Sequence, residues 1–179
     1  MVAVSGSRAP AALPARAATL GRLGSTQVFQ VPSGKALALS EANHGGKAVL
    51  LSLWATWCAP CRREMPTIEK LYQEFKDRVA FIGIAQDLNR PDNRKKVMAI
   101  VKETAVTFPQ FLEADGLTVE EKIFGKDVAA LPAFALYGAD GKLVLNTIGA
   151  ISDPENLARL SAALRSTSGG RAKPRKEKP

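Results

Sequence analysis

The chain has 179 residues, 46% of them apolar and 23% charged, so it can bury a hydrophobic core and does not belong to the disordered or fibrous classes. The formal charge of +8 comes mainly from the two ends: residues 1–24 carry three arginines and no acid, and residues 166–179 carry five basic residues and one glutamate. Because the middle of the chain has no comparable excess of positive charge, we expect no nucleic-acid partner.

The chemistry of the chain is limited by its two cysteines and one histidine. Cys58 and Cys61 cannot form a scaffold of several disulfides, and they offer too few ligands for a four-ligand zinc site, so we expect neither a metal nor a cofactor. His44, the only histidine, lies in a turn next to two glycines, which disfavours a hydrolase triad.

Composition divides the chain into three pieces: a flexible Ala/Arg-rich segment over residues 1–25, one folded domain over residues 26–165, and a disordered basic tail over residues 166–179. The first piece could be a transit peptide, or a linker left after a signal or an anchor has been removed. No run reaches the roughly 18 apolar residues that a membrane span needs.

The first half of the domain predicts a hairpin followed by a βαβ unit. Short extended runs at residues 28–31 and 36–39 flank a Pro-Ser-Gly-Lys turn. A continuous apolar run at residues 48–54 predicts a strand buried on both faces, a helical pattern follows at residues 59–76, and residues 79–85 predict another strand. The crossover rule makes these two strands parallel and places the cysteines at the carboxyl edge of the sheet.

The second half of the domain continues the alternation. It predicts a helix at residues 91–103, an extended segment at 108–112, a hairpin of strands 133–137 and 143–148 joined through Asp-Gly, and a last helix that opens at Asp153-Pro154 and runs toward residue 166.

The motif Trp57-Cys58-Ala59-Pro60-Cys61 lies between the buried strand and the helix, which is the context that a redox-active C-x-x-C requires. At the helix start, free N–H groups and the helix dipole stabilise a thiolate, so Cys58 is the expected attacking sulfur. Cys61, one turn later, is the expected resolving sulfur. Pro60 suits the first turn, where its missing donor is not needed. The alternatives are a buried structural pair and half of a zinc site shared with a partner chain.

At these residues the chain resembles the thioredoxin superfamily, and most closely its TlpA/ResA-type reductases, over about residues 28–165. The resemblance rests on residues 53–62, on Met65-Pro66, on Leu131-Pro132, and on the turn at residues 138–142 before Gly149. It implies an α/β fold of the thioredoxin-like three-layer type, in which helices flank a central mixed β-sheet that carries an N-terminal β-hairpin.

The resemblance also implies roles for residues outside the cysteine pair. Pro132 is expected to be a cis proline that faces the cysteines, with Leu131 pairing to an extended substrate segment. Trp57 is expected to shield the disulfide, whereas Trp54 on the buried strand is interpreted as a core residue. Pro66 stands where the family bends its active-site helix.

Two residues depart from the family pattern. Ser52 stands six residues before Cys58, where many thioredoxins bury an aspartate, so the acceptor for the Cys61 proton stays open between water, Glu64, Asp87 and the substrate thiolate. Leu131 is bulkier than the small or β-branched residue that often precedes the cis proline.

The function that the resemblance implies is reduction of protein disulfides, with an upstream thiol donor restoring the dithiol. Ala and Pro between the cysteines, without a histidine, favour a reducing potential. We expect a monomer in the periplasm or cell envelope, where such relatives reduce disulfides of apocytochromes or copper sites to thiols; the cytoplasm or an organelle stays an alternative. The competing hypotheses are a redox-inert binding, chaperone or copper-delivery module, and a peroxidase, against which the C-x-x-C argues.

Overall fold

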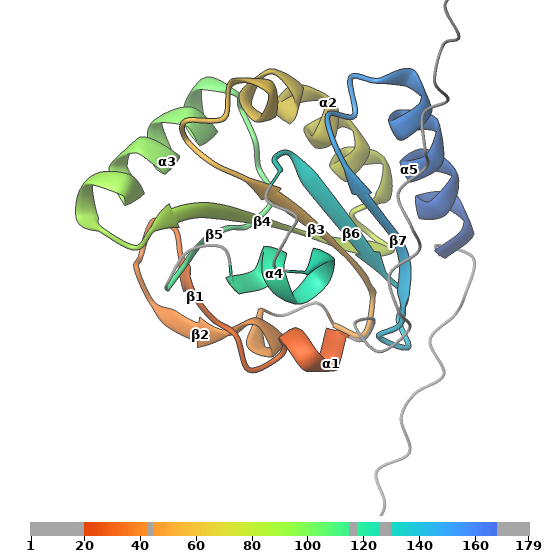
Figure 1. Ribbon diagram of the computed structural model, residues 1–179, viewed down its shortest axis with the longest axis horizontal. Helices are drawn as coiled ribbons and strands as arrows, with labels where there is room; N and C mark the ends of the chain where they lie inside the picture. Colours follow the sequence, from red (N-terminus) through yellow and green to blue (C-terminus); the bar gives the residue numbers. More distant parts are fainter. Residues whose placement is uncertain (1–19, 43–44, 115–117, 126–129, 168–179) are drawn as a thin grey trace, which may run out of the picture.

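The computed structural model describes residues 20–42, 45–114, 118–125 and 130–167 (Figure 1). In these ranges one mixed sheet has the strand order β2-β1-β5-β4-β3-β6-β7. The strands are β1 (Gln27–Gln30), β2 (Ala36–Ala38), β3 (Ala48–Trp54), β4 (Val79–Leu88), β5 (Gln110–Glu113), β6 (Ala133–Tyr137) and β7 (Leu143–Ile148). The helices are α1 (Leu20–Leu23), the 3-10 helix η2 (Leu39–Glu41), α2 (Ala59–Phe75), α3 (Pro91–Glu103), α4 (Thr118–Phe124) and α5 (Pro154–Thr167).

Helices cover both faces of the sheet (Figure 1). Side chains of α2, α3 and α5 pack on one face, and side chains of α1, η2 and α4 pack on the other. Neighbouring strand residues point to opposite faces, so Leu50 of β3 belongs to the first core and Leu51 to the second. The expected three-layer α/β fold is therefore confirmed.

The unit β3–α2–β4 places the cysteine motif. The strands β3 and β4 are parallel, with Leu50 beside Phe81 and Trp54 beside Ala85. Every residue of β3 is buried, because this strand has a neighbour on each side and helices over both faces. The chain leaves β3 at its carboxyl end and enters α2 within five residues, so the predicted position of the cysteines at that sheet edge is confirmed.

The predicted N-terminal hairpin is present as the antiparallel pair β1–β2. Strand β1 also pairs with β5, where Phe29 lies beside Leu112. Strand β5 begins at Gln110 and not at residue 108, because Phe108 turns into the core and Pro109 has no N–H to donate. Strand β4 continues to Leu88, three residues beyond its predicted end, through an irregularity in its pairing with β5.

The C-terminal elements follow the prediction closely. Strands β6 and β7 are antiparallel, and the turn between them is closed by a hydrogen bond from the Gly141 N–H to the Gly138 carbonyl (2.8 Å). Gly141 has a φ of +78°, which glycine adopts without a steric cost. At the start of α5, Oδ1 of Asp153 accepts hydrogen bonds from the backbone N–H groups of Glu155 (2.8 Å) and Asn156 (3.2 Å), as expected of an N-cap.

The short helices α1 and α4 were not predicted, and neither was the 3-10 helix η2. In α1, Leu23 is buried in the second core, so packed residues precede the predicted domain boundary at residue 26. Helix α4 covers the same face of the sheet through Val119, Ile123 and Phe124. Residues 1–19, the predicted turn at His44 and the tail from residue 168 lie outside the described residues. Within the described ranges, no helix combines the length and the apolar character that a membrane span requires.

Candidate active site

Cys58 and Cys61 form a disulfide at the start of α2, with their Cα atoms 5.3 Å apart. Cys58 is the N-cap residue of the helix, and its Sγ accepts a hydrogen bond from the backbone N–H of Cys61 (3.3 Å). Both residues are buried, Cys58 at 5% and Cys61 at 1% exposure. Cys58 is thus the more accessible sulfur, and it has a backbone donor directed at it that can stabilise negative charge.

The turn before Cys58 is anchored to β4 by Asp87. Its Oδ2 accepts a hydrogen bond from the backbone N–H of Thr56 (2.8 Å), and its Oδ1 accepts one from the Thr56 hydroxyl (2.6 Å). Asp87 stands in the part of β4 where pairing with β5 shifts register, and such bulges re-aim side chains next to active sites. Because both oxygens are occupied by Thr56, Asp87 is a poorer acceptor for the Cys61 proton than the sequence allowed.

The two tryptophans differ in burial. Trp54 is 2% exposed, which confirms its interpretation as a core residue, and its Nε1 donates to Oε1 of Gln110 (3.0 Å). Gly83 of β4 makes room for Gln110, since a Cβ at residue 83 would collide with the Gln110 side-chain amide. Trp57 is 70% exposed and therefore forms part of the surface beside the disulfide.

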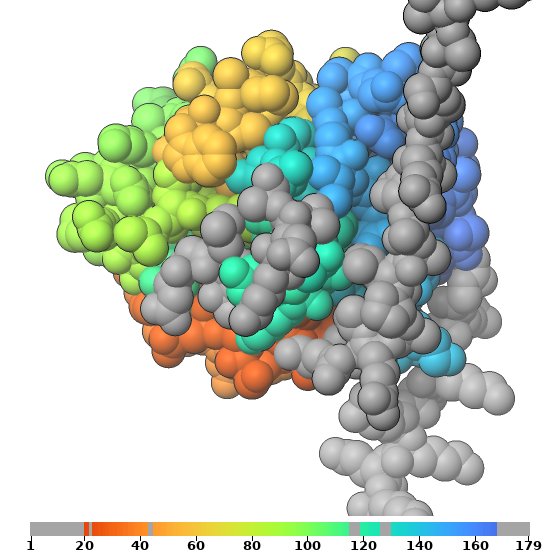
Figure 2. Space-filling view, viewed as in Figure 1, coloured from red at the N-terminus to blue at the C-terminus, as the bar shows by residue number. Residues whose placement is uncertain are grey.

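Leu131 and Pro132 lie at the same sheet edge as the cysteines. Antiparallel pairing places Ala133, the first residue of β6, beside Leu53 near the end of β3. On the molecular surface the chain around residues 55–65 (gold) meets the chain after residue 130 (teal), as Figure 2 shows. The Leu131–Pro132 peptide bond is cis, as the resemblance implies, and the Pro132 carbonyl accepts a hydrogen bond from the Gly149 N–H (2.8 Å).

Glu64 is a buried carboxyl group one helical turn beyond Cys61. It is 2% exposed, and its Oε2 accepts a hydrogen bond from the backbone N–H of Ile151 (2.7 Å), while its Oε1 has no hydrogen-bond partner among the described residues. Burial raises the pKa of Glu64 from 4.5 to about 7, against the opposing effect of backbone hydrogen bonds from Ile151 and Ser152. A carboxyl group with this pKa can accept or release a proton near neutral pH.

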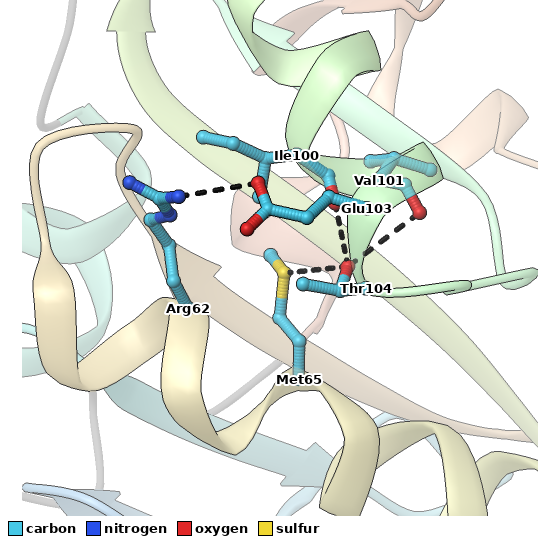
Figure 3. A network of polar contacts seen from close by, with 6 residues as sticks. All are labelled: Arg62, Met65, Ile100, Val101, Glu103 and Thr104. Carbon is cyan, nitrogen blue, oxygen red and sulfur yellow. Dashed lines mark hydrogen bonds and ion pairs between the residues drawn. The ribbon is translucent and has the colours of Figure 1, made fainter.

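The first turns of α2 are joined to the end of α3 (Figure 3). Arg62 forms an ion pair with Glu103 (3.2 Å) in which both side chains are substantially exposed. The Thr104 hydroxyl lies 3.4 Å from Sδ of the buried Met65 and 2.7 Å from the Ile100 carbonyl. Arg62 thus points toward α3 from a partly exposed position on α2.

Another buried carboxyl group, that of Glu120 in α4, contacts the loop that carries Leu131. Its Oε1 accepts a hydrogen bond from the backbone N–H of Ala130 (2.9 Å), and its side chain is 2% exposed. Neither Glu120 nor the helix that carries it was predicted from the sequence. The available signal was the i,i+4 spacing of Val119 and Ile123, too short a pattern to define a helix by itself.

In the described ranges, no three His, Cys, Asp or Glu residues gather into a cluster that could hold a metal ion. Pro60 occupies the first turn of α2, as expected. The structure thus brings Trp57, Cys58, Cys61, Leu131 and Pro132 to one edge of the sheet.

A family comparison agrees with this geometry. The Redoxin family model matches residues 6–164. The chain belongs to the Redoxin family. Its similarity to ResA proteins and to thioredoxin-like structures confirms the expected resemblance to the thioredoxin superfamily and to its ResA/TlpA type.

Among curated relatives of this Redoxin chain, the thiol-disulfide oxidoreductase ResA of Bacillus subtilis is 30% identical over 127 residues, which are 70% of this chain and 65% of ResA. The thioredoxin-like protein YneN of the same organism is 36% identical over 91 residues, which are 51% of this chain and 52% of YneN. The chain therefore spans between about half and two thirds of the length of these relatives.

Solved structures share the fold of this Redoxin domain. A Bacteroides thetaiotaomicron protein, described as a candidate protein disulfide isomerase, has a TM-score of 0.65 and 30% identity, and the match covers 86% of this chain and 94% of that one. A secreted disulfide oxidoreductase of Mycobacterium tuberculosis, described as homologous to DsbE, has a TM-score of 0.62 and 23% identity, with coverage of 81% and 98%. At this identity, the likeness to the Mycobacterium tuberculosis protein shows a shared fold and nothing more.

Proposed function

We propose that this chain is a thiol–disulfide oxidoreductase that reduces disulfides of protein substrates through a dithiol/disulfide cycle of Cys58 and Cys61. The observation that carries the proposal is the disulfide between these residues at the N-terminus of α2, in a chain of the Redoxin family. Relatives named thiol-disulfide oxidoreductase support the same chemistry.

The first step is attack by the Cys58 thiolate on a substrate disulfide. A Cys58–substrate S–S bond forms as the substrate S–S bond breaks, and the second substrate sulfur leaves as a thiolate that takes up a proton. The backbone N–H of Cys61 and the helix N-terminus stabilise the negative charge on Cys58 before attack.

The second step is attack by Cys61 on Sγ of Cys58. The Cys58–Cys61 bond forms, the mixed disulfide breaks, and the substrate leaves with two electrons more than it had at the start. Cys61 must lose its proton for this attack, and Glu64 is the group we assign as the acceptor. Its free Oε1, its pKa of about 7 and its place one turn along α2 support that role. An upstream thiol donor then reduces the disulfide again.

Substrate positioning falls to the residues around the disulfide. Trp57 offers an exposed apolar surface beside Cys58, and Pro60 shapes the first turn between the cysteines. Leu131 and Pro132 provide the edge against which an extended substrate segment can pair. The bulk of Leu131 narrows this edge and favours small substrate side chains opposite it.

For the cellular setting we infer a monomer in the periplasm or cell envelope, acting on protein disulfides without nucleic acid. The resemblance to ResA/TlpA-type reductases supports this location. Reduction of apocytochrome disulfides to thiols in cytochrome c maturation is the reaction that the ResA/TlpA resemblance favours.

The test is insulin-disulfide reduction by wild type and by Cys58→Ser. Wild type should turn over with a thiol donor and Cys58→Ser should not; equal rates would favour the redox-inert binding module. Cys61→Ser should accumulate mixed disulfides, because the resolving sulfur is gone, and mass spectrometry of those adducts would name the substrate. A redox potential as positive as about −120 mV would instead make the protein an oxidant.

A further inference from the structure

Glu120 makes a contact that the proposed mechanism does not use. Its buried carboxylate in α4 accepts the backbone N–H of Ala130 at 2.9 Å, and Ala130 directly precedes Leu131 and Pro132. Hydrogen bonds to a charged acceptor are stronger than those between neutral groups. The contact therefore ties the loop beside the cysteines to a helix on the opposite face of the sheet from α2.

Helix α4 is itself firmly placed. Oε1 of Glu113, a fully buried residue at the end of β5, accepts a hydrogen bond from the backbone N–H of Val119 (3.1 Å). Val119 and Ile123 are buried in the second core, and Nζ of Lys122 donates to the Thr26 hydroxyl (2.7 Å). The carboxylate of Glu120 therefore belongs to a helix that is fixed on the sheet, and it is not a mobile surface group.

The loop is anchored on both sides of Leu131. Glu120 holds the N–H of Ala130, and the N–H of Gly149 holds the carbonyl of Pro132. Between these anchors, no hydrogen bond among the described residues uses the backbone N–H or C=O of Leu131. With no partner among those residues, the two groups can pair with an incoming extended segment, and the anchors set their direction.

We propose that Glu120 is a positioning residue for protein substrates: by fixing Ala130, it orients the free backbone groups of Leu131 toward a substrate segment held beside Cys58. This inference rests on the proposed disulfide reductase function. A small disulfide, which has no extended segment to pair, does not need this orientation.

Steady-state kinetics with two substrates tests the inference, using insulin as a protein disulfide and bis(2-hydroxyethyl) disulfide, which has no peptide backbone, as a small one. Removing the acceptor in Glu120→Ala should raise KM for insulin about tenfold, as expected for the loss of one hydrogen bond to a charged group. Its rate with bis(2-hydroxyethyl) disulfide and the redox potential of Cys58–Cys61 should stay at wild-type values. Glu120→Gln keeps an acceptor oxygen and should restore KM to within about threefold of wild type.

The matched control is Glu121→Ala, the same change at an exposed neighbouring position of α4. It should leave both substrates unaffected. If Glu120→Ala does not fold, Glu120→Asp replaces it, because this variant keeps the charge but is one methylene too short to reach Ala130, and it should show the same selective rise in KM.

Two results would overturn the inference while leaving the reductase function intact: an unchanged KM for insulin in the Glu120 variants, or a parallel loss of rate with both disulfides. Failure of wild type itself to reduce insulin or bis(2-hydroxyethyl) disulfide would instead remove the proposed function, and the inference with it.

Discussion

The Asp87 carboxylate binds Thr56 twice, through the threonine backbone N–H at 2.8 Å and its hydroxyl at 2.6 Å. Thr56 stands two residues before Cys58, so this pair fixes the turn from which the attacking sulfur emerges. A strand residue 31 positions away thereby controls the entry of the chain into α2.

Replacing Asp87 with alanine should lower the free energy of unfolding by about 2 kcal/mol, because two donors of Thr56 lose a charged acceptor. The melting temperature of the oxidised protein should fall by roughly 4–8 °C. Calorimetry measures the change. Asp92→Ala serves as the control, since that aspartate is 86% exposed and forms only a long ion pair with Lys95. Equal melting temperatures for the two variants would show that the Thr56 contacts contribute nothing to stability.

The buried carboxyl of Glu64 should make stability depend on pH in a defined direction. Its pKa rises from 4.5 in the unfolded chain to about 7 in the folded one, so between these values the folded state holds more protons than the unfolded state. The free energy of unfolding should therefore fall as pH rises from about 4.5 to 7, by on the order of 3 kcal/mol. Urea denaturation of wild type and Glu64→Gln should show this fall in wild type only; parallel pH profiles would contradict it.

The ion pair between Arg62 and Glu103 should contribute little to the free energy of unfolding. The two side chains are 41% and 65% exposed, and exposed pairs contribute between 0 and about 1 kcal/mol. Arg62→Ala and Glu103→Ala should each change the free energy of unfolding by less than about 1 kcal/mol. Since Arg62 points toward α3, the thiolate of Cys58, followed by its absorbance at 240 nm against pH, should titrate as in wild type. A clear rise in the pKa of the Cys58 thiol in Arg62→Ala would instead assign Arg62 a role in stabilising the thiolate.

Gly83 should not tolerate a side chain, because Gln110 occupies the space where its Cβ would lie. Gly83→Ala should cost about 1–3 kcal/mol of stability by overpacking. In a Gln110→Ala background, where that space is open, the same substitution should cost much less. A double-mutant cycle by denaturation measures the difference, with Gly21→Ala as the control, since a Cβ there meets no atom within 4 Å. Equal costs in both backgrounds would rule out this contact as the cause.

The sequence predicted those features that depend on local patterns. Helix α3 begins and ends at its predicted residues because Pro91 starts it and helical spacing continues to Glu103. The turn before Lys142 and the cap at Asp153 also depend on neighbouring residues alone, as does the position of the cysteine pair between a buried strand and a helix.

The features that the sequence could not predict depend on partners far apart in the chain. Nothing near Gln110 indicates that it binds Trp54, 56 residues earlier, or that Gly83 leaves space for it. The contact between Glu120 and Ala130 needs both a short helix and a particular loop path. The raised pKa of Glu64 follows from burial beneath Ile151, which only the tertiary structure supplies.

The pairing of β1 with β5 has a consequence for biosynthesis. Within the described ranges, the N-terminal hairpin joins the sheet only through β5, so Phe29 must wait for Leu112 before it can dock. Of the described strands, β1 and β2 are synthesised before the others, and about seventy residues lie between the end of β2 at Ala38 and the start of β5 at Gln110. Strand β1 therefore gains its neighbour β5 only after β3 and β4 have been made, and the side chains that face this partner stay uncovered in the meantime.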